Sequence, residues 1–148
     1  ALLDKWRHAN QKIVFTNGVF DLIHAGHVDY LFKAKQLGDV LIVGLNSDDS
    51  VIRIKGNKRP ILKQEERAFV LTNLKPVDYV VFFDENTPEK LISEIIPDIL
   101  VKGADWAVEK IVGREVVEKN GGKVMNIEFV NDQSTSKIID LIVQRYSK

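Results

Sequence analysis

The sequence has no cysteine in 148 residues, which excludes disulfides, thiolate metal ligands and a thiol nucleophile. It also lacks any run of about 18 apolar residues, so no membrane-spanning helix or secretory signal is predicted. Neither sign of charge is in excess, because 21 basic residues balance 21 acidic ones. No overall field therefore attracts nucleic acid or an anionic membrane. We expect neither as a partner, and we expect a location in the reducing cytoplasm.

What the chain does contain is the pattern of one enzyme-sized domain, with 45% hydrophobic residues. Short β-branched segments alternate with amphipathic helical ones, which is typical of a parallel sheet covered on both faces. The expected strands are 12–16, 39–45, 78–83, 98–102 and 123–129. The expected helices lie near 27–37, 64–74, 88–95, 109–120 and 134–146. The sequence thus predicts one α/β domain over 1–148, Rossmann-like and doubly wound, with its ligand beyond the carboxyl ends of the strands.

One segment, T-N-G-V-F-D-L-I-H-A-G-H, runs from the first expected strand into the first expected helix. His24 and His27 bracket Gly26 at the helix start, where free N–H groups and the helix dipole favour an anion. Two imidazole donors can hold one phosphoryl group from two sides, and the glycine allows close approach. Asp21 is a candidate to orient a histidine or to meet a metal ion's water shell. H-x-x-H is also a metal-ligand spacing, but the remaining histidine, His8, lies in the N-terminal lead, so we expect no protein-held metal.

A second segment, R-I-K-G-N-K-R-P at 53–60, places four cations within seven residues of an expected loop. Such a run is typical of a solvated surface. It also follows a strand, where a bound triphosphate needs positive charge to offset the charge of the transition state. Lys55 and Lys58 are flexible point charges, whereas Arg59 offers a planar fork for phosphate. Arg67, in the next expected helix, is a further phosphate candidate.

Two later segments are open to plain structural explanations. L-V-K-G-A-D-W at 100–106 is a strand followed by a polar turn, and Trp106 as a half-buried cover would explain it equally well. S-T-S-K-I-I at 134–139 opens the last expected helix, and an N-cap by Ser134 or Thr135 is sufficient to account for it. Three hydroxyls and a lysine at a helix N-terminus also form a cradle for an anion.

Together these four segments resemble the cytidylyltransferase-like nucleotidyltransferases, in an order that covers most of the chain. The string G-V-F-D-L-I-H-A-G-H carries most of the resemblance. The resemblance implies a Rossmann-like fold and transfer of a nucleoside monophosphate to a phosphorylated small molecule. It also implies Mg²⁺ bound with the nucleoside triphosphate, and a homodimer, since homodimers are common in this family.

The same resemblance implies roles for individual residues. His24, His27 and Lys55 would be catalytic and contact the phosphates during transfer. The turn at 102–106 would meet the base and ribose, and the serine-rich helix start would hold the β and γ phosphates. Nucleotide binding is implied in this way for Gly18, Val19, Phe20, Asp21, Gly26, Lys102, Gly103, Asp105, Ser134, Thr135 and Ser136. Further contacts to substrate or phosphate are implied for Asn17, Lys58, Arg59 and Arg67.

Within the family, T-N-G-V-F-D-L-I-H-A-G-H-V, L-I-V-G-L-N-S-D and K-G-N-K-R-P-I are most similar to the adenylyltransferases of ADP-heptose synthesis. That similarity implies ATP and D-glycero-D-manno-heptose 1-phosphate as substrates, in lipopolysaccharide biosynthesis. Many such domains are fused behind a sugar kinase, so we expect a domain of such a fusion or a stand-alone enzyme. The alternatives are family members acting on glycerol 3-phosphate, FMN or phosphoethanolamine with CTP or ATP, and a silent nucleotide-binding module.

Overall fold

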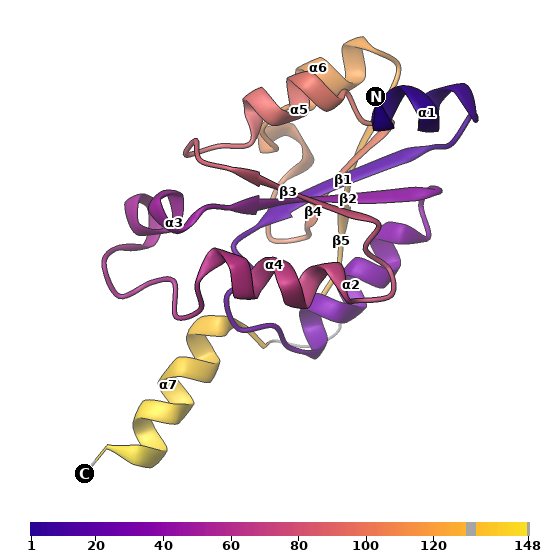
Figure 1. Ribbon diagram of the computed structural model, residues 1–148. Helices are drawn as coiled ribbons and strands as arrows, with labels where there is room; N and C mark the ends of the chain where they lie inside the picture. The colour runs from indigo at the N-terminus through magenta and orange to yellow at the C-terminus, as the bar shows by residue number, and fades with distance from the viewer. Residues whose placement is uncertain (130–132, 148) are drawn as a thin grey trace.

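A parallel sheet of five strands, in the order β3-β2-β1-β4-β5, forms the centre of the protein (Figure 1). The computed structural model describes residues 1–129 and 133–147. The strands are β1 (Ile13–Gly18), β2 (Val40–Asn46), β3 (Tyr79–Phe83), β4 (Ile99–Gly103) and β5 (Lys123–Ile127). Each begins and ends within two residues of its expected bounds, so the predicted α/β sheet is confirmed.

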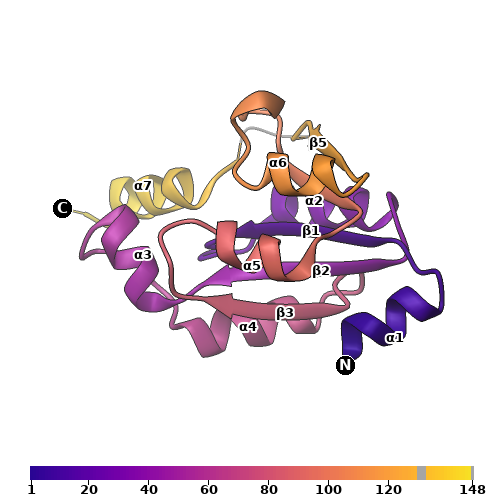
Figure 2. The ribbon, with the colours of Figure 1, turned by 90° about the horizontal axis from the view of Figure 1, so that it is seen from above.

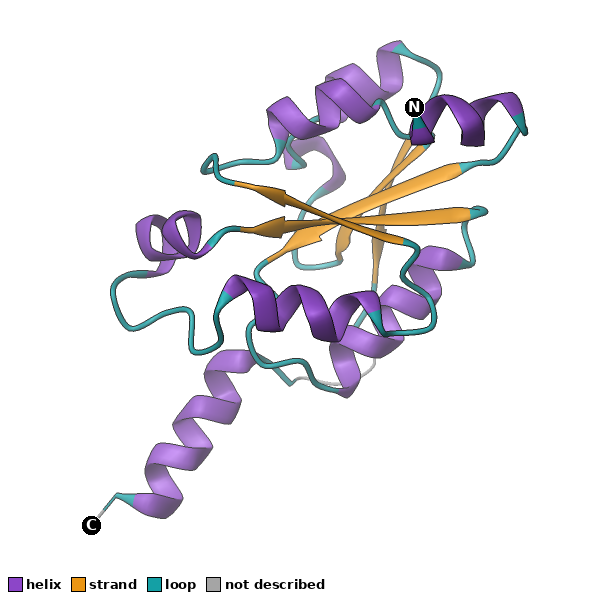
Figure 3. Cartoon of the chain, in the orientation of Figure 1, coloured by secondary structure: helices purple, strands orange, loops and turns teal. Residues whose placement is uncertain are grey.

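Helices connect the strands, and two of them were not expected from the sequence (Figure 3). The α-helices of the described residues are α1 (Leu2–His8), α2 (Ala25–Lys35), α3 (Asp48–Lys55), α4 (Gln64–Thr72), α5 (Glu89–Ile95), α6 (Arg114–Lys119) and α7 (Thr135–Tyr146). The two unexpected helices are α1 and α3. The helix expected at 109–120 is shorter, since its regular part begins at Arg114. A 3-10 turn at Val108–Lys110 comes before it, followed by Gly113, whose φ is 91°.

Helix α3 occupies part of the segment for which a basic loop was predicted. Ser47 caps the helix by accepting a hydrogen bond from the Ser50 amide at 3.2 Å, and acidic residues occupy the first turn. The helix ends at Gly56, whose φ of 94° suits a residue without Cβ. The prediction of a loop was therefore wrong for residues 53–55, which form the last turn of α3.

The sheet has a hydrophobic core on each face, because neighbouring strand residues point to opposite sides. Helices α2 and α4 cover one face, while α1, α5 and α6 cover the other, as Figures 1 and 2 show. The first core includes Val14, Leu31, Leu41, Val43 and Leu71. The second includes Ile13, Phe15, Ile42, Ile92, Leu100 and Val117.

The functional edge of the sheet forms where β1 separates from β4. These two strands pair at only two positions, Val14 with Ile99 and Phe15 with Leu100. Beyond them β1 continues along β2 as far as Gly18, while β4 continues along β5. A gap therefore opens between the carboxyl ends of β1 and β4, at the switch point where sheets of this class bind ligands.

Helix α7 extends away from the body of the domain, with the C-terminus at its far end (Figure 1). Thr135, at its start, is its one buried residue. Its apolar side chains Leu141, Ile142, Val143 and Tyr146 are between 42% and 82% exposed. Across the described ranges, no helix has the length and apolar character needed to cross a bilayer.

The core assignment predicts a large difference between two truncations to alanine. Leu100 in β4 is fully buried, so Leu100→Ala should lower the free energy of unfolding by about 2–5 kcal/mol. Phe69 in α4 is 71% exposed, so Phe69→Ala should change it by less than about 0.5 kcal/mol. Urea denaturation followed by circular dichroism measures both, and equal losses would contradict the assigned core.

Candidate active site

A pocket of about 850 Å³ lies at the separation of β1 from β4. Its walls come from the end of β1, the start of α2, the end of α3, the turn after β4 and the start of α7. The predicted residues that line it are Asn17, Gly18, Val19, Phe20, His24, His27, Lys55, Arg59, Lys102, Gly103, Asp105, Ser134, Thr135 and Ser136. The fold thus brings most of the predicted residues into one cavity.

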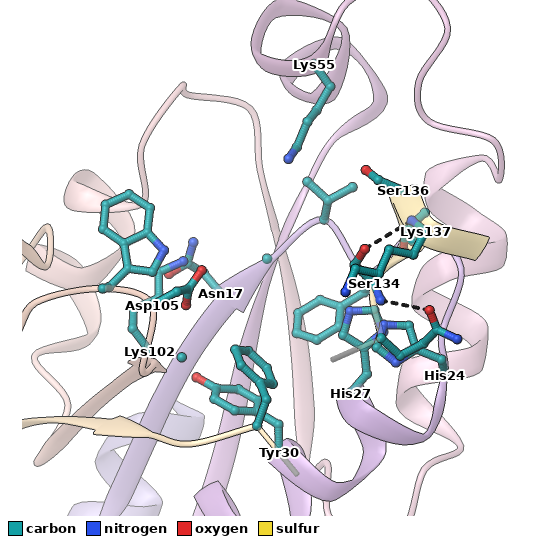
Figure 4. Close-up of a pocket in the computed structure, with 18 of the residues that line it drawn as sticks. Asn17, His24, His27, Tyr30, Lys55, Lys102, Asp105, Ser134, Ser136 and Lys137 are labelled. Carbon is teal, nitrogen blue, oxygen red and sulfur yellow. Dashed lines mark hydrogen bonds between the residues drawn. The ribbon is translucent and has the colours of Figure 1, made fainter. Parts of the chain in front are cut away.

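The two histidines form a stacked pair at the start of α2 (Figure 4). Their ring centres are 3.9 Å apart, with 25° between the ring planes. The Gly26 amide donates to Nδ1 of His24 at 3.1 Å, so a neutral His24 ring carries its proton on Nε2. This bond uses the Gly26 amide within the chain, and Gly26, for which nucleotide binding was implied, is not among the lining residues. Nε2 of His24 and Nδ1 of His27 are buried without a hydrogen-bond partner among the described residues, a costly state that a ligand oxygen would relieve.

Both imidazoles are neutral at pH 7. Burial lowers the pKa of His24 below its usual 6.5. Burial, together with repulsion from His24, lowers the pKa of His27 to about 4. Neutral imidazoles can serve as N–H donors to a phosphate, but its negative charge would then have to be balanced by other side chains.

Lys55 and Lys102, two of the lysines that line the pocket, come from different elements (Figure 4). Lys55 reaches it from the last turn of α3, and Lys102 from the end of β4. The Lys102 ammonium lies 5.5 Å from the centre of the Trp106 ring, a cation–π distance. Burial lowers the pKa of Lys102, Asp105 raises it and Lys55 lowers it, with a lowered pKa as the result. An anion bound in the pocket would stabilise both ammonium groups.

The other cations of the 53–60 segment differ in where they lie. Arg53 does not line the pocket, since it donates to Asn86 Oδ1 at 2.9 Å and pairs with Asp84. Lys58 is exposed and lies outside the lining. Arg59 does line the pocket, with a side chain only 15% exposed. Of the predicted phosphate ligands in this segment, the fold places Lys55 and Arg59 at the pocket and leaves Lys58 outside it.

The carboxylate of Asp21 is fully buried and is not part of the pocket lining. It accepts hydrogen bonds from the amides of Ile61 and Leu62, and from Nε of Arg59 at 2.8 Å. No hydrogen bond joins it to either histidine in the described part of the chain. The expectation that Asp21 orients a histidine was therefore wrong, because all of its bonds go to the segment before α4.

Arg67 is likewise a structural residue and not a phosphate ligand. It is fully buried in α4. Its guanidinium donates to the carbonyl oxygens of Leu62, Val19 and Asn46, and to Asp48 Oδ1 at 2.7 Å. The predicted phosphate contact is wrong, because these four bonds hold the ends of β1 and β2 against α3 and α4.

The start of α7 forms another wall of the pocket. Ser134 caps the helix, since its Oγ accepts from the Lys137 amide at 3.1 Å. The Thr135 hydroxyl donates to the Leu22 carbonyl at 3.2 Å and accepts from the Leu22 amide at 3.3 Å. Its proton is thus used to bind α7 to the loop between β1 and α2 (residues 19–24, the histidine loop), which disfavours the expected phosphate contact by Thr135. Ser136 lines the same wall.

The pocket is also lined by two aromatic side chains that were not predicted from the sequence, Tyr30 and Phe129. The ring of Phe129 stacks on Tyr30, with centroids 5.6 Å apart, and the Tyr30 hydroxyl meets Thr16 Oγ1 at 2.8 Å. A Cβ on Gly103 would lie 2.4 Å from the Phe129 ring, so any other residue there would force that ring to move. Tyr30 follows His27 at helical spacing, a signal present in the sequence, whereas Phe129 had none. Gln133 and Lys137 also line the pocket.

The pocket offers little to hold a metal ion by protein groups alone. Within residues 1–129 and 133–147, no three histidine, aspartate, glutamate or cysteine side chains are grouped closely enough for a metal site. Asp105 is the carboxylate among the lining residues. A divalent ion at this site would therefore be held mainly by the phosphates of a nucleotide and by water.

The switch point of the parallel sheet thus brings together neutral imidazoles, the charges of lysine and arginine, and a capped helix start. This is the construction of an α/β domain that binds nucleotides and acts at phosphorus. The sequence matches the Cytidylyltransferase-like family over residues 15–141. The chain therefore belongs to the cytidylyltransferase-like family, whose enzymes are nucleotidyltransferases.

Curated relatives and a solved structure agree with this assignment. The chain is 58% identical over 136 residues to the bifunctional protein HldE of Citrifermentans bemidjiense, covering 92% of this chain and 28% of that protein. It is 56% identical over 141 residues to HldE of Helicobacter pylori strain Shi470, covering 95% and 30%. The chain thus spans less than a third of these relatives. The lipopolysaccharide core biosynthesis protein of Thermoplasma volcanium superposes with a TM-score of 0.65 at 32% identity, covering 83% of this chain and 99% of that one.

The buried histidines predict that stability depends on pH. The pKa of His27 is about 4 in the folded state against a usual 6.5, so between these values the unfolded chain binds more protons. The free energy of unfolding should therefore fall as the pH drops from 6.5 towards 4, by at most about 1.4 kcal/mol per pH unit for this histidine.

Urea denaturation at a series of pH values measures this slope. His27→Gln should reduce it, whereas His8→Gln, which removes an exposed imidazole on α1, should leave it as in the wild type. Identical slopes in all three proteins would contradict the buried, neutral state of His27.

Proposed function

We propose that this domain transfers an adenylyl group from ATP to D-glycero-D-manno-heptose 1-phosphate, forming ADP-heptose and pyrophosphate. The observation that carries the proposal is the neutral histidine pair, facing Lys55 and Lys102 across one pocket, with two buried nitrogens that have no partner among the described residues. The HldE relatives, at 50–58% identity over at least 92% of this chain, support the choice of heptose chemistry.

The reaction requires in-line attack of a sugar phosphate oxygen on the α-phosphorus of ATP. The new P–O bond forms as the bond from the α-phosphorus to the bridging oxygen breaks, and the electron pair leaves with pyrophosphate. The attacking phosphate is already an anion at neutral pH, so catalysis rests on positioning and charge stabilisation and not on a strong base. Both substrates are anionic, which explains why the site collects cations.

Each wall of the pocket has a task in this mechanism. His24 and His27 donate N–H groups to the α- and β-phosphate oxygens as charge develops there. Lys55 neutralises the charge of the transition state from the opposite wall. Ser134 and Ser136, at the start of α7, hold the departing pyrophosphate through their hydroxyl groups and the positive end of the helix.

The nucleotide would enter with a magnesium ion, which screens the charge of the triphosphate. The donor set of the pocket fits this arrangement, since Asp105 is the lining carboxylate and the phosphates supply the other oxygen ligands. Lys102 and Gly103 at the end of β4, and Trp106 in the turn that follows, would contact the base and ribose. An enzyme that uses ATP is expected in the cytoplasm.

Replacing His27 should abolish turnover without unfolding the domain. Loss of one transition-state donor typically costs roughly 10²–10³ in kcat, and His27→Ala should show a loss of that order. The measurement is pyrophosphate release with ATP or CTP, each combined with heptose 1-phosphate, glycerol 3-phosphate or FMN.

The control is His8→Ala, which should turn over like the wild type, and circular dichroism confirms that both variants are folded. Wild-type release with ATP and heptose 1-phosphate supports the proposal. Release only with another pair of substrates would reassign the acceptor, and normal turnover of His27→Ala would refute the mechanism.

We also infer that the domain forms a homodimer through α7. Ile138, Leu141, Ile142 and Tyr146 recur at helical spacing, and three of them are at least 42% exposed along a helix that extends from the body. An apolar stripe of this kind is unfavourable in water, and a second copy of the helix would cover it.

The dimer is tested by the mass in solution. Light scattering should give twice the chain mass of 16.8 kDa for the wild type and for Gln144→Glu, a change at an exposed polar position of α7. Ile142→Glu places a charge in the stripe and should give the monomer mass. A monomeric wild type at micromolar concentration would overturn this inference.

A further inference from the structure

The segment 59–62, which leads from the basic residues into α4, is tied to the histidine loop by Asp21. The Ile61 amide donates to Oδ2 of Asp21 at 2.8 Å, and the Leu62 amide donates to Oδ1 at 2.9 Å. Nε of Arg59 donates to Oδ2 at 2.8 Å. A single carboxylate, three residues before His24, therefore holds three donors of a segment about 40 residues further along the chain.

Arg67 holds the same segment from the other side. Its Nε donates to the Leu62 carbonyl at 3.0 Å, and its Nη1 donates to the Val19 carbonyl at 2.9 Å. The amide of Leu62 is thus bound to Asp21, and its carbonyl is bound to Arg67. Since Val19 and Asp21 both belong to the histidine loop, the segment cannot shift relative to the histidines without breaking these bonds.

Asp21 remains ionised in this position. Burial alone would raise its pKa, but the hydrogen bonds from Ile61 and Leu62 and the charge and hydrogen bond of Arg59 outweigh that effect and lower it. The negative charge is consequently balanced before any ligand binds. A carboxylate this close to a phosphate site would otherwise repel the substrate.

This arrangement leaves the two terminal NH₂ groups of Arg59 available to bind a ligand. Its Nε is bonded to Asp21, and its terminal nitrogens donate to no side chain or carbonyl among the described residues. The side chain is only 15% exposed and lines the same pocket as His24 and His27. A guanidinium held through Nε presents its two remaining NH₂ groups as a fork, the geometry that matches phosphate oxygens.

We propose that Asp21 is a positioning residue, which fixes the guanidinium of Arg59 in the pocket that His24 and His27 also line, to receive a substrate phosphate group. Arg67 supports this by holding Leu62 on its other side. Asp21 acts through Arg59 and touches no substrate itself. The proposal rests on the proposed function only for the identity of the phosphorylated ligand.

A double-mutant cycle on Asp21 and Arg59 separates positioning from a general structural role. The proteins are the wild type, Asp21→Asn, Arg59→Ala and the double variant. The readouts are kcat/KM for pyrophosphate release and the Kd of MgATP by calorimetry. Arg59→Ala should lower kcat/KM roughly 10- to 100-fold, the loss of one or two hydrogen bonds to a charged group. If Asp21 acts through Arg59, adding Asp21→Asn to the Arg59→Ala variant should lower kcat/KM by less than a further factor of about three.

Asp78 provides the matched control, because its carboxylate also accepts from a backbone amide, that of Leu41 at 2.7 Å, and pairs with Lys35. Asp78 precedes β3, so it lies at the amino ends of the parallel strands, whereas the pocket lies at their carboxyl ends. Asp78→Asn should lower the melting temperature while leaving kcat/KM within about twofold of the wild type, as expected for a site without a shared partner.

The proposal would be overturned if the fold-losses in kcat/KM of Asp21→Asn and Arg59→Ala simply multiplied in the double variant. An Asp21→Asn variant with wild-type kcat/KM would also overturn it. If Asp21→Asn does not fold, Asp21→Glu keeps the charge but moves it by one methylene, and the same cycle is run with it. A wild type that binds MgATP but adenylylates no sugar phosphate would refute the proposed function alone, and the cycle would then be judged on the Kd of MgATP.

Discussion

The separation of β1 from β4 is the constraint on which the rest of this structure depends. Two pairs of residues join these central strands, and then each follows its outer neighbour. The peptide groups at their carboxyl ends therefore face a cavity instead of each other, with Asn17 and Gly18 on one side and Lys102 and Gly103 on the other. The hydrophobic cores on both faces keep the strands in this arrangement, because any change of register would expose buried side chains.

The loop between β1 and α2 connects the elements around that cavity. Val19 receives a hydrogen bond from Arg67, Asp21 binds the segment 59–62, and Leu22 exchanges two hydrogen bonds with Thr135. The same loop ends at His24, and His27 follows in the first turn of α2. A phosphate held by the histidines would thus lie at a set spacing from Arg59 and from the start of α7. Catalysis by positioning requires such fixed spacing, because the reacting groups must be aligned before the bond to phosphorus forms.

The local parts of this protein were predictable, and the reasons are physical. Buried parallel strands read as short apolar runs, so all five strands were placed within two residues. The histidine loop was recognisable because its residues are contiguous. Helix α3 was missed because its sequence, D-D-S-V-I-R-I-K, is mostly charged or exposed, and its stability depends on the Ser47 cap and on contacts of Arg53 with the loop after β3.

The sequence by itself determined the α/β class, the positions of the strands and the chemistry available at their carboxyl ends, since these follow from local periodicity and residue type. Only the tertiary structure decided which charged groups face a ligand. Asp21 and Arg67 look like site residues in the sequence, yet both are buried and bonded to backbone, whereas Tyr30 and Phe129 line the pocket. The reason is that burial and pairing depend on contacts between residues distant in the chain, which no local pattern records.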